Sequence, residues 1–122
     1  MKSQNNGIKE RSYEFALRII TLVRSITSSR DGNVLGRQVL RSGTSMGVPI
    51  VIGIEEATGA FSKGDFIFKM NTALKEARET KYWLRLIRDS TILPSRRMSP
   101  IIDETEEIKN MLGAIVRSSR KK

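Results

Sequence analysis

Four glutamates lie where paired carboxylates could do chemistry: Glu55, Glu56, Glu76 and Glu79. Carboxylates on facing helices of a bundle can hold two iron ions, but that architecture also uses Glu-x-x-His motifs. The chain contains no histidine, so we expect no metal site and no other cofactor. A simpler interpretation is that these acids form inter-helix ion pairs, which fix register more than they add stability. The candidate partners are Arg37 and Arg41, with Arg78 and Arg85 further along the chain.

Side chains for nucleophilic or acid–base catalysis are scarce in this sequence. The chain has no cysteine and no histidine, which removes the commonest nucleophile–base pairs and the commonest general base. Ser62 and Lys63 could formally form a Ser–Lys dyad, but a helix cap followed by a solvated lysine explains the same residues. The glycines match neither P-loop nor dinucleotide-binding spacing. We therefore expect a protein that is not an enzyme.

Basic residues dominate the charged side chains. The formal net charge is +9 and the pI is near 10.4, and such an excess favours encounters with polyanions, nucleic acid above all. The alternative is a protein–protein scaffold whose basic residues only solvate its helix faces. Tyr82 and Trp83 could stack on bases, although aromatic residues beside a helix seam more often belong to a core or a subunit contact. The residues assigned to nucleic-acid binding are Arg11, Arg18, Arg96, Arg97, Arg117, Arg120, Lys121 and Lys122.

Four amphipathic segments are expected to position these groups, as helices near residues 11–29, 33–58, 62–89 and 99–118. Ser12, Ser62 and Ser99 are plausible N-caps, and Pro100 suits a first helical position. The third segment has the clearest pattern, a four–three spacing typical of left-handed bundles. Its seam residues are Phe66, Met70, Ala73, Ala77, Thr80, Leu84 and Ile87.

The other segments each show an apolar face. Short connections between four such helices predict an all-α fold, an antiparallel up-down four-helix bundle. We expect one domain over residues 1–122, with residues 1–10 and 119–122 flexible. The residues expected to face inward are Phe15, Ile19, Leu22, Val23 and Ile26 in the first helix, Val34, Val39, Leu40 and Met46 in the second, and Ile101, Ile108, Leu112 and Ile115 in the fourth.

The stretch from Met46 to Ile54 interrupts this pattern, because it is wholly apolar and contains Pro49. A strand over 48–54 would leave its backbone unpaired, since no other segment alternates convincingly. Pro49 cannot donate its amide and disfavours a helical residue before it. We therefore expect the second helix to kink or bulge between Gly47 and Gly53 and to end at Gly59 in a left-handed conformation.

The remaining sequence features concern location. The apolar run is too short to cross a bilayer, which needs about 20 residues. No apolar segment follows a basic start, so a secretory signal is not expected. The sequence predicts a cytoplasmic protein that has no membrane partner.

Three stretches resemble one family: LGRQVLRSGTSMG, IEEATGAFSKGDFIFKM and ALKEARETKYWLRLI. The chain is similar to the bacterial four-helix bundle proteins, also described as 23S rRNA intervening-sequence proteins. The family pattern places Gln and Arg before a Ser-Ile-Gly step, which here reads Gln38, Arg41 and Ser45-Met46-Gly47. Its Ile-Glu-Glu-Ala step corresponds to residues 54–57, and its later Gly, Ser and Asp-Phe to Gly59, Ser62 and residues 65–66.

This chain departs from the family in one place, with six residues rather than about two between Gly47 and the Ile-Glu-Glu step. Four added residues turn an α-helix by about 400°, so the following faces shift by about 40° unless a bulge absorbs them. The resemblance, which extends to the accessory variability determinant of diversity-generating retroelements, implies a ring-like homopentamer. It also implies binding to RNA, DNA or a nucleic-acid enzyme such as a reverse transcriptase. The apolar residues expected to include subunit contacts are Met46, Val48, Ile50, Val51, Ile52, Ile54, Tyr82 and Trp83.

Overall fold

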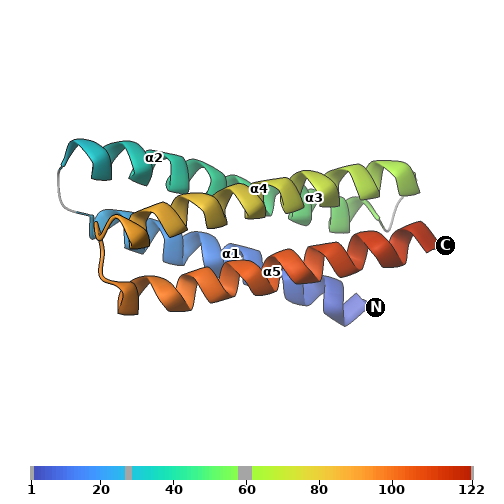
Figure 1. Cartoon of the computed structure of the whole chain (residues 1–122). Helices are drawn as coiled ribbons and strands as arrows, with labels where there is room; N and C mark the ends of the chain where they lie inside the picture. Colours follow the sequence, from blue (N-terminus) through green and yellow to red (C-terminus); the bar gives the residue numbers. More distant parts are fainter. Residues whose placement is uncertain (1, 27–28, 58–61, 122) are drawn as a thin grey trace.

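The computed structural model describes residues 2–26, 29–57 and 62–121, with backbone alone for residues 2–6. Its helices are α1 (Lys2–Arg24), α2 (Arg30–Ser45), α3 (Gly47–Glu56), α4 (Lys63–Asp89) and α5 (Ser95–Lys121). Only Met46 separates α2 from α3, so these two helices form one of four rods (Figure 1). The described residues contain no strand. The all-α four-helix bundle predicted from the sequence is therefore confirmed.

Successive rods lie side by side around the bundle. The rod of α2 and α3 contacts both α1 and α4, and α5 contacts both α4 and α1. Within the described chain, the backbone of α1 does not approach that of α4 closely, and the backbone of α5 does not approach that of α2 or α3 closely. Both chain ends lie at the same end of the bundle, as an up-down topology requires (Figure 1).

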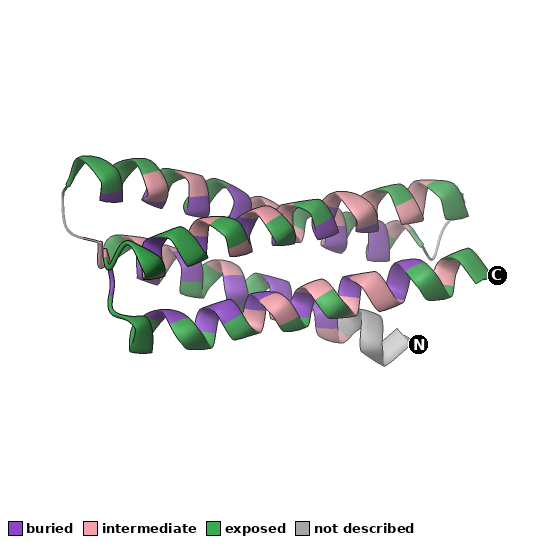
Figure 2. Cartoon of the chain, viewed as in Figure 1, coloured by how far each residue is buried: buried purple, intermediate pink, exposed green. Residues whose placement is uncertain are grey.

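The core runs along the middle of the four rods, where each presents its buried face (Figure 2). The seam predicted for α4 is confirmed, because its residues from Met70 to Ile87 are buried and Phe66 is partly buried. Ser62 caps this helix, since its hydroxyl accepts a hydrogen bond from the Asp65 amide at 3.1 Å. The inward residues predicted for α1 and the fourth rod are also buried or partly buried.

The inner face of α2 differs from the prediction. Val34 is 48% exposed and Leu40 is 36% exposed, so their expected inward position is wrong. Small residues occupy that face instead, because α1 and α4 approach α2 closely. A search for periodic hydrophobic residues does not detect a buried helix face that consists mainly of glycine and serine. The buried residues of α2 are Gly32, Gly36, Val39, Ser42 and Gly43.

The bounds of α1 and α5 also differ from the predicted ones. Helix α1 begins before residue 11, and its fully buried Ile8 extends the apolar face about two turns beyond Phe15. Ser12 is thus not an N-cap; it lies inside the helix, and its hydroxyl donates to the Lys9 carbonyl at 3.0 Å. Helix α5 begins before Ser99, with Pro100 inside it and Met98 fully buried.

The second rod is interrupted just before the predicted site. Met46 itself has helical dihedral angles, φ −57° and ψ −38°. Pro49 lies in the first turn of α3, where a missing amide hydrogen costs least. Residues 47–53 therefore form regular helix, and the break lies at Met46 rather than within them. Gly59, the predicted terminator, lies outside the described residues.

Candidate nucleic-acid interface

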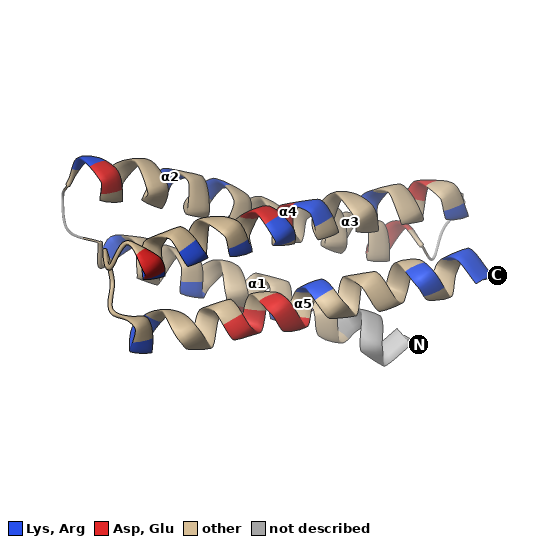
Figure 3. Ribbon diagram, in the orientation of Figure 1, with Lys and Arg blue, Asp and Glu red and all other residues tan. Residues whose placement is uncertain are grey.

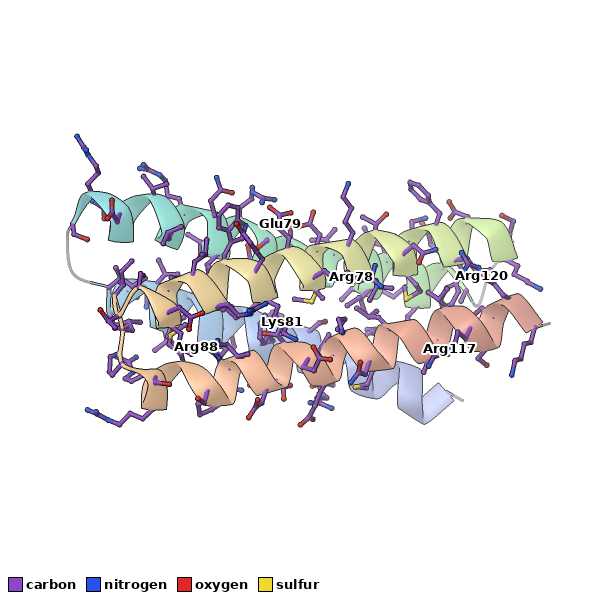
Figure 4. All side chains as sticks on the ribbon, in the orientation of Figure 1. Arg78, Glu79, Lys81, Arg88, Arg117 and Arg120 are labelled. Carbon is purple, nitrogen blue, oxygen red and sulfur yellow. The ribbon has the colours of Figure 1, made fainter. Side chains whose placement is uncertain are left out.

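Four basic residues follow one edge of α4: Arg78, Lys81, Arg85 and Arg88. Their spacing of three, four and three residues places them within about 80° of arc on a helix that turns 100° per residue. This edge borders α5, because Lys81 Nζ lies 2.8 Å from Oε1 of Glu106. Figure 4 shows Arg78, Lys81 and Arg88 on this side of α4 and Glu79 on the other.

The neighbouring edge of α5 adds Lys109, Arg117 and Arg120. Lysine and arginine gather along α4 and at the C-terminal end of α5, while acidic residues gather in the middle of α5 (Figure 3). We call the resulting surface the α4–α5 basic face. Its members are Arg78, Lys81, Arg85, Arg88, Lys109, Arg117 and Arg120.

A groove of about 490 Å³ is hollowed into one end of this face. The buried side chains of Leu74 and Val116 form part of its lining, and its polar lining includes two amides. We call it the α4–α5 groove. Its lining residues are Asn71, Leu74, Arg78, Lys109, Asn110, Gly113, Val116, Arg117 and Arg120.

Gly113 helps to shape this groove. A glycine in a helix interior costs about 1 kcal/mol relative to alanine, so its presence in α5 calls for a local reason. A Cβ atom at this position would lie 3.3 Å from Nη1 of Arg117. The Arg117 guanidinium thus lies back over the bare backbone of Gly113, inside the groove.

The charges on the α4–α5 basic face are only partly neutralised. Glu106 lies between Lys81 and Lys109, at 2.8 Å and 3.0 Å from their Nζ atoms. Hydrogen bonds from Lys81 and Lys109 lower the pKa of Glu106 below its ordinary value. Arg88 pairs with the adjacent Asp89. Among the described residues of this face, Arg78, Arg85, Arg117 and Arg120 form no ion pair with a carboxylate, although Arg85 lies near Asp89. Three of these four arginines line the groove, so positive charge is concentrated there.

The structure separates the basic residues that the sequence assigned to nucleic-acid binding. Arg117 and Arg120 lie in the α4–α5 groove. Arg18 and Arg97 line a second hollow of about 300 Å³ between α1 and α5, which also holds Glu14. The remaining positions are Arg96, exposed in the first turn of α5; Lys121, exposed at its end; and Lys122, outside the described residues.

Arg11 is engaged in a different interaction. Its guanidinium contacts both carboxylate oxygens of Glu104, at 3.1 Å and 2.7 Å, and Oε1 of Glu107 at 2.8 Å. These hydrogen bonds raise the pKa of Arg11 above its ordinary value. Two carboxylates already neutralise this guanidinium, so it ties α1 to α5 and has little charge to offer a phosphate.

The residues expected in inter-helix ion pairs lie mainly between the second and third rods. Arg41 contacts Glu79, and its Nη1 lies 3.6 Å from Glu76. Glu79 also accepts a hydrogen bond from the Trp83 indole at 3.2 Å. The other two glutamates contact lysines rather than arginines: Glu55 lies 3.4 Å from Lys9, and Glu56 lies 2.7 Å from Lys69. Arg37 lines a shallow hollow between α1 and α2 and forms no ion pair within the described chain.

Sequence reasoning missed most of the α4–α5 basic face. Arg78 and Arg85 were considered only as partners of glutamates, and Lys81 and Arg88 were not singled out. The three–four–three spacing of basic residues was visible in the sequence and could have identified the edge of α4. The groove needs α5 beside it, which spacing alone does not supply.

Two further properties bear on candidate functions. No group of three or more acidic residues in the described chain is placed to hold a metal ion. None of the helices, over the residues described, is long and apolar enough to span a membrane.

Comparison with known proteins identifies a family and solved structures that resemble this chain. The profile of the 23S rRNA-intervening sequence protein family matches residues 4–114. A crystal structure of a protein of unknown function from the S23 ribosomal protein family of Bacteroides thetaiotaomicron is 38% identical and superposes with a TM-score of 0.80. That match covers 93% of this chain and 98% of the other. No curated protein matches the chain. The chain therefore belongs to the 23S rRNA-intervening sequence protein family.

Proposed function

We propose that this protein binds nucleic acid through the α4–α5 basic face and has no catalytic role. One observation carries the proposal: basic side chains from two helices gather on one side of the bundle, and four of its arginines form no ion pair among the described residues. Phosphate contacts supply most of the non-specific affinity of such proteins and weaken as salt rises. The name of the family supports an RNA-linked role. The proposal places the protein in the cytoplasm.

The expected mode of recognition is contact with the phosphate backbone. Arginine presents a planar fork of donors that matches phosphate oxygens. Contacts of this kind position a protein on nucleic acid but carry no sequence information directly. We therefore expect similar affinity for unrelated sequences, and a partner such as a reverse transcriptase would meet the protein on shared nucleic acid.

Fluorescence anisotropy with labelled RNA and DNA across a salt series tests this proposal. Each phosphate contact should contribute about −0.9 to the log–log salt slope on duplex DNA and about −0.7 on single strands. Replacing Arg85 and Arg88 by glutamine should weaken binding and flatten the slope. Arg24→Gln with Arg30→Gln is the matched control, because both arginines are exposed and lie on α1 and α2, outside the α4–α5 basic face.

Two outcomes would contradict the proposal. Absence of binding to any RNA or DNA at about 50 mM salt, where phosphate contacts are strong, would leave a protein–protein scaffold as the function. A larger loss from Arg96→Ala with Arg97→Ala than from Arg85→Gln with Arg88→Gln would move the interface to the α1 side of α5.

We also propose that copies of this chain associate, as a homopentamer by resemblance to the family. Met46, Ile50 and Ile54 lie in the chain's own core, so they are not available for subunit contacts. The exposed apolar side chains that support association are Val48 and Ile52 on α3 and Phe68, Tyr82 and Leu86 on α4. Phe68, Tyr82 and Leu86 are spaced by 14 and four residues, which places them within about 40° on α4. Light scattering at the single-chain mass of 13.8 kDa would contradict association.

A further inference from the structure

We infer that the α4–α5 groove is a discrete binding site for one phosphate group, held between Arg78, Arg117 and Arg120. This inference rests on the proposed function and makes the groove the fixed point at which a bound strand is anchored. The rest of the α4–α5 basic face would then attract the strand only through diffuse charge.

The arrangement of charge distinguishes the groove from the rest of the face. Lys81 and Lys109 share Glu106, and Arg88 pairs with Asp89. Arg85 forms no ion pair among the described residues, but it lies near the same Asp89 carboxylate. The guanidinium groups of Arg78, Arg117 and Arg120 line the groove from two helices and, within the described chain, have no carboxylate partner. An anion between them would gain charge-assisted hydrogen bonds without breaking an existing ion pair.

The shape of the groove supports a located ligand. Its volume of about 490 Å³ falls in the range of ligand pockets, roughly 300–1,000 Å³. Leu74 and Val116 are nearly fully buried within it, and an apolar wall strengthens electrostatic attraction nearby. The amides of Asn71 and Asn110 can donate further hydrogen bonds to a phosphate or its sugar.

Gly113 supplies an independent reason to expect a site. A mid-helix glycine disagrees with local helix preference, and such disagreements concentrate at functional positions. The position lies against the Arg117 guanidinium, 3.3 Å from the Cβ that alanine would add. Alanine at 113 would therefore move the guanidinium by a few tenths of an ångström without changing any charge.

The phosphate could belong to the interior of a strand, to its 5′ end or to free inorganic phosphate. These sources share the same chemistry, and oligonucleotides with and without a 5′-phosphate distinguish the first two. Equal affinity indicates an internal phosphodiester. Weaker binding without the 5′-phosphate indicates a strand end, whose second negative charge would suit three cations.

Two measurements on the full chain test the inference. Broadening of the ³¹P resonance of inorganic phosphate reports the groove alone, and anisotropy with labelled oligonucleotides reports the whole face. Arg117→Gln should lower phosphate affinity about tenfold, as expected for the loss of charged hydrogen bonds. Gly113→Ala should lower it severalfold at unchanged net charge, while Gly36→Ala on α2, a matched glycine replacement, should leave it unchanged.

The outcomes separate this inference from the proposed function. Arg85→Gln with Arg88→Gln should weaken oligonucleotide binding but change phosphate affinity less than twofold. If Gly113→Ala and Arg117→Gln both leave phosphate affinity unchanged while oligonucleotides still bind, the charge is diffuse and the inference is wrong. If they abolish phosphate binding in a protein that binds no oligonucleotide, the groove remains a phosphate site and the proposed function fails.

Discussion

Two glycines on the side of α2 that faces α1 are expected to respond in opposite ways to replacement by alanine: one replacement should stabilise the fold and the other should destabilise it. A Cβ atom at Gly43 would lie 2.8 Å from Cγ1 of Ile19, 3.1 Å from its Cγ2 and 3.2 Å from its Cδ1. A Cβ atom at Gly36 would lie 3.5 Å from Val23 and 3.6 Å from Ile26. Carbon atoms pack best at about 3.5–4.0 Å, so alanine fits at 36 and collides at 43.

The magnitudes follow from two opposing terms. Replacing glycine by alanine inside a helix stabilises by about 1 kcal/mol, and at Gly36 the new methyl group adds ordinary contacts. At Gly43 the fully buried Ile19 cannot move aside freely, and overpacking costs about 1–3 kcal/mol. We expect Gly36→Ala to raise the free energy of unfolding by about 1 kcal/mol and Gly43→Ala to lower it by about 1 kcal/mol.

Urea unfolding followed by fluorescence of Trp83, the sole tryptophan, and by circular dichroism measures both effects. The variants must be compared at one protein concentration, because association would make the midpoint depend on concentration. If Gly43→Ala were as stable as Gly36→Ala, α1 and α2 would not approach as closely as the structure places them. The reasoning from small residues on the α2 face would then be refuted.

Three further predictions concern single side chains. Thr91 has a φ of +61° at the end of α4, a conformation that costs a non-glycine residue about 1–2 kcal/mol, so Thr91→Gly should raise the unfolding midpoint in urea. Arg11→Ala should lower the free energy of unfolding by about 1–2 kcal/mol, between the values for surface and buried pairs, and Arg11→Lys should recover part of that loss in the same assay. The pKa of Glu106 is lowered from 4.5 by hydrogen bonds from Lys81 and Lys109, so its contribution to stability is full above about pH 4.5 and is lost as pH falls through the lowered pKa. Glu106→Gln should therefore be less sensitive to acid over that window, as measured by unfolding at several pH values.

The third rod was predictable because one strong pattern described it. Its seam residues keep a four–three spacing over the length of α4, and Ser62 supplies a hydrogen-bonding cap. These are local properties that neighbouring elements do not override. Helix α2 lacked such a pattern, since glycines and Ser42 make up most of its inner face and Val39 is its one buried hydrophobic residue.

The ends of α1 and α5 were set by tertiary packing rather than by local signals. Ile8 and Met98 are each fully buried outside the predicted bounds. Burying a side chain of this size stabilises by about 1.5–3 kcal/mol, which is comparable to the cost of Pro100 inside α5. Helix α5 therefore begins before Ser99, because burial of Met98 extends it and leaves Ser99 inside the helix.

The resemblance to the family indicated four added residues after Gly47, and the break in the second rod lies at Met46, immediately before that glycine. Four residues exceed one helical turn by about 40°, which is a small rotation. Val39, Met46, Ile50 and Ile54 remain buried at spacings of seven, four and four residues on both sides of the break. The apolar face is thus continuous, and an interruption at Met46 suffices without a larger bulge at Pro49.

The α4–α5 groove could not have been predicted from spacing, because its arginines are far apart in sequence. Arg78 and Arg117 line the same groove only when α4 and α5 pack antiparallel, in a register that also places Lys81 beside Glu106. Glu106 contacts both Lys81 and Lys109. The arginines that line the groove have no acidic partner among the described residues. The same register that satisfies the charges at the centre of the α4–α5 basic face therefore leaves positive charge unsatisfied at its end. A site for an anion follows from this imbalance in charge along two paired helices, and the net charge of the whole chain could not have located it.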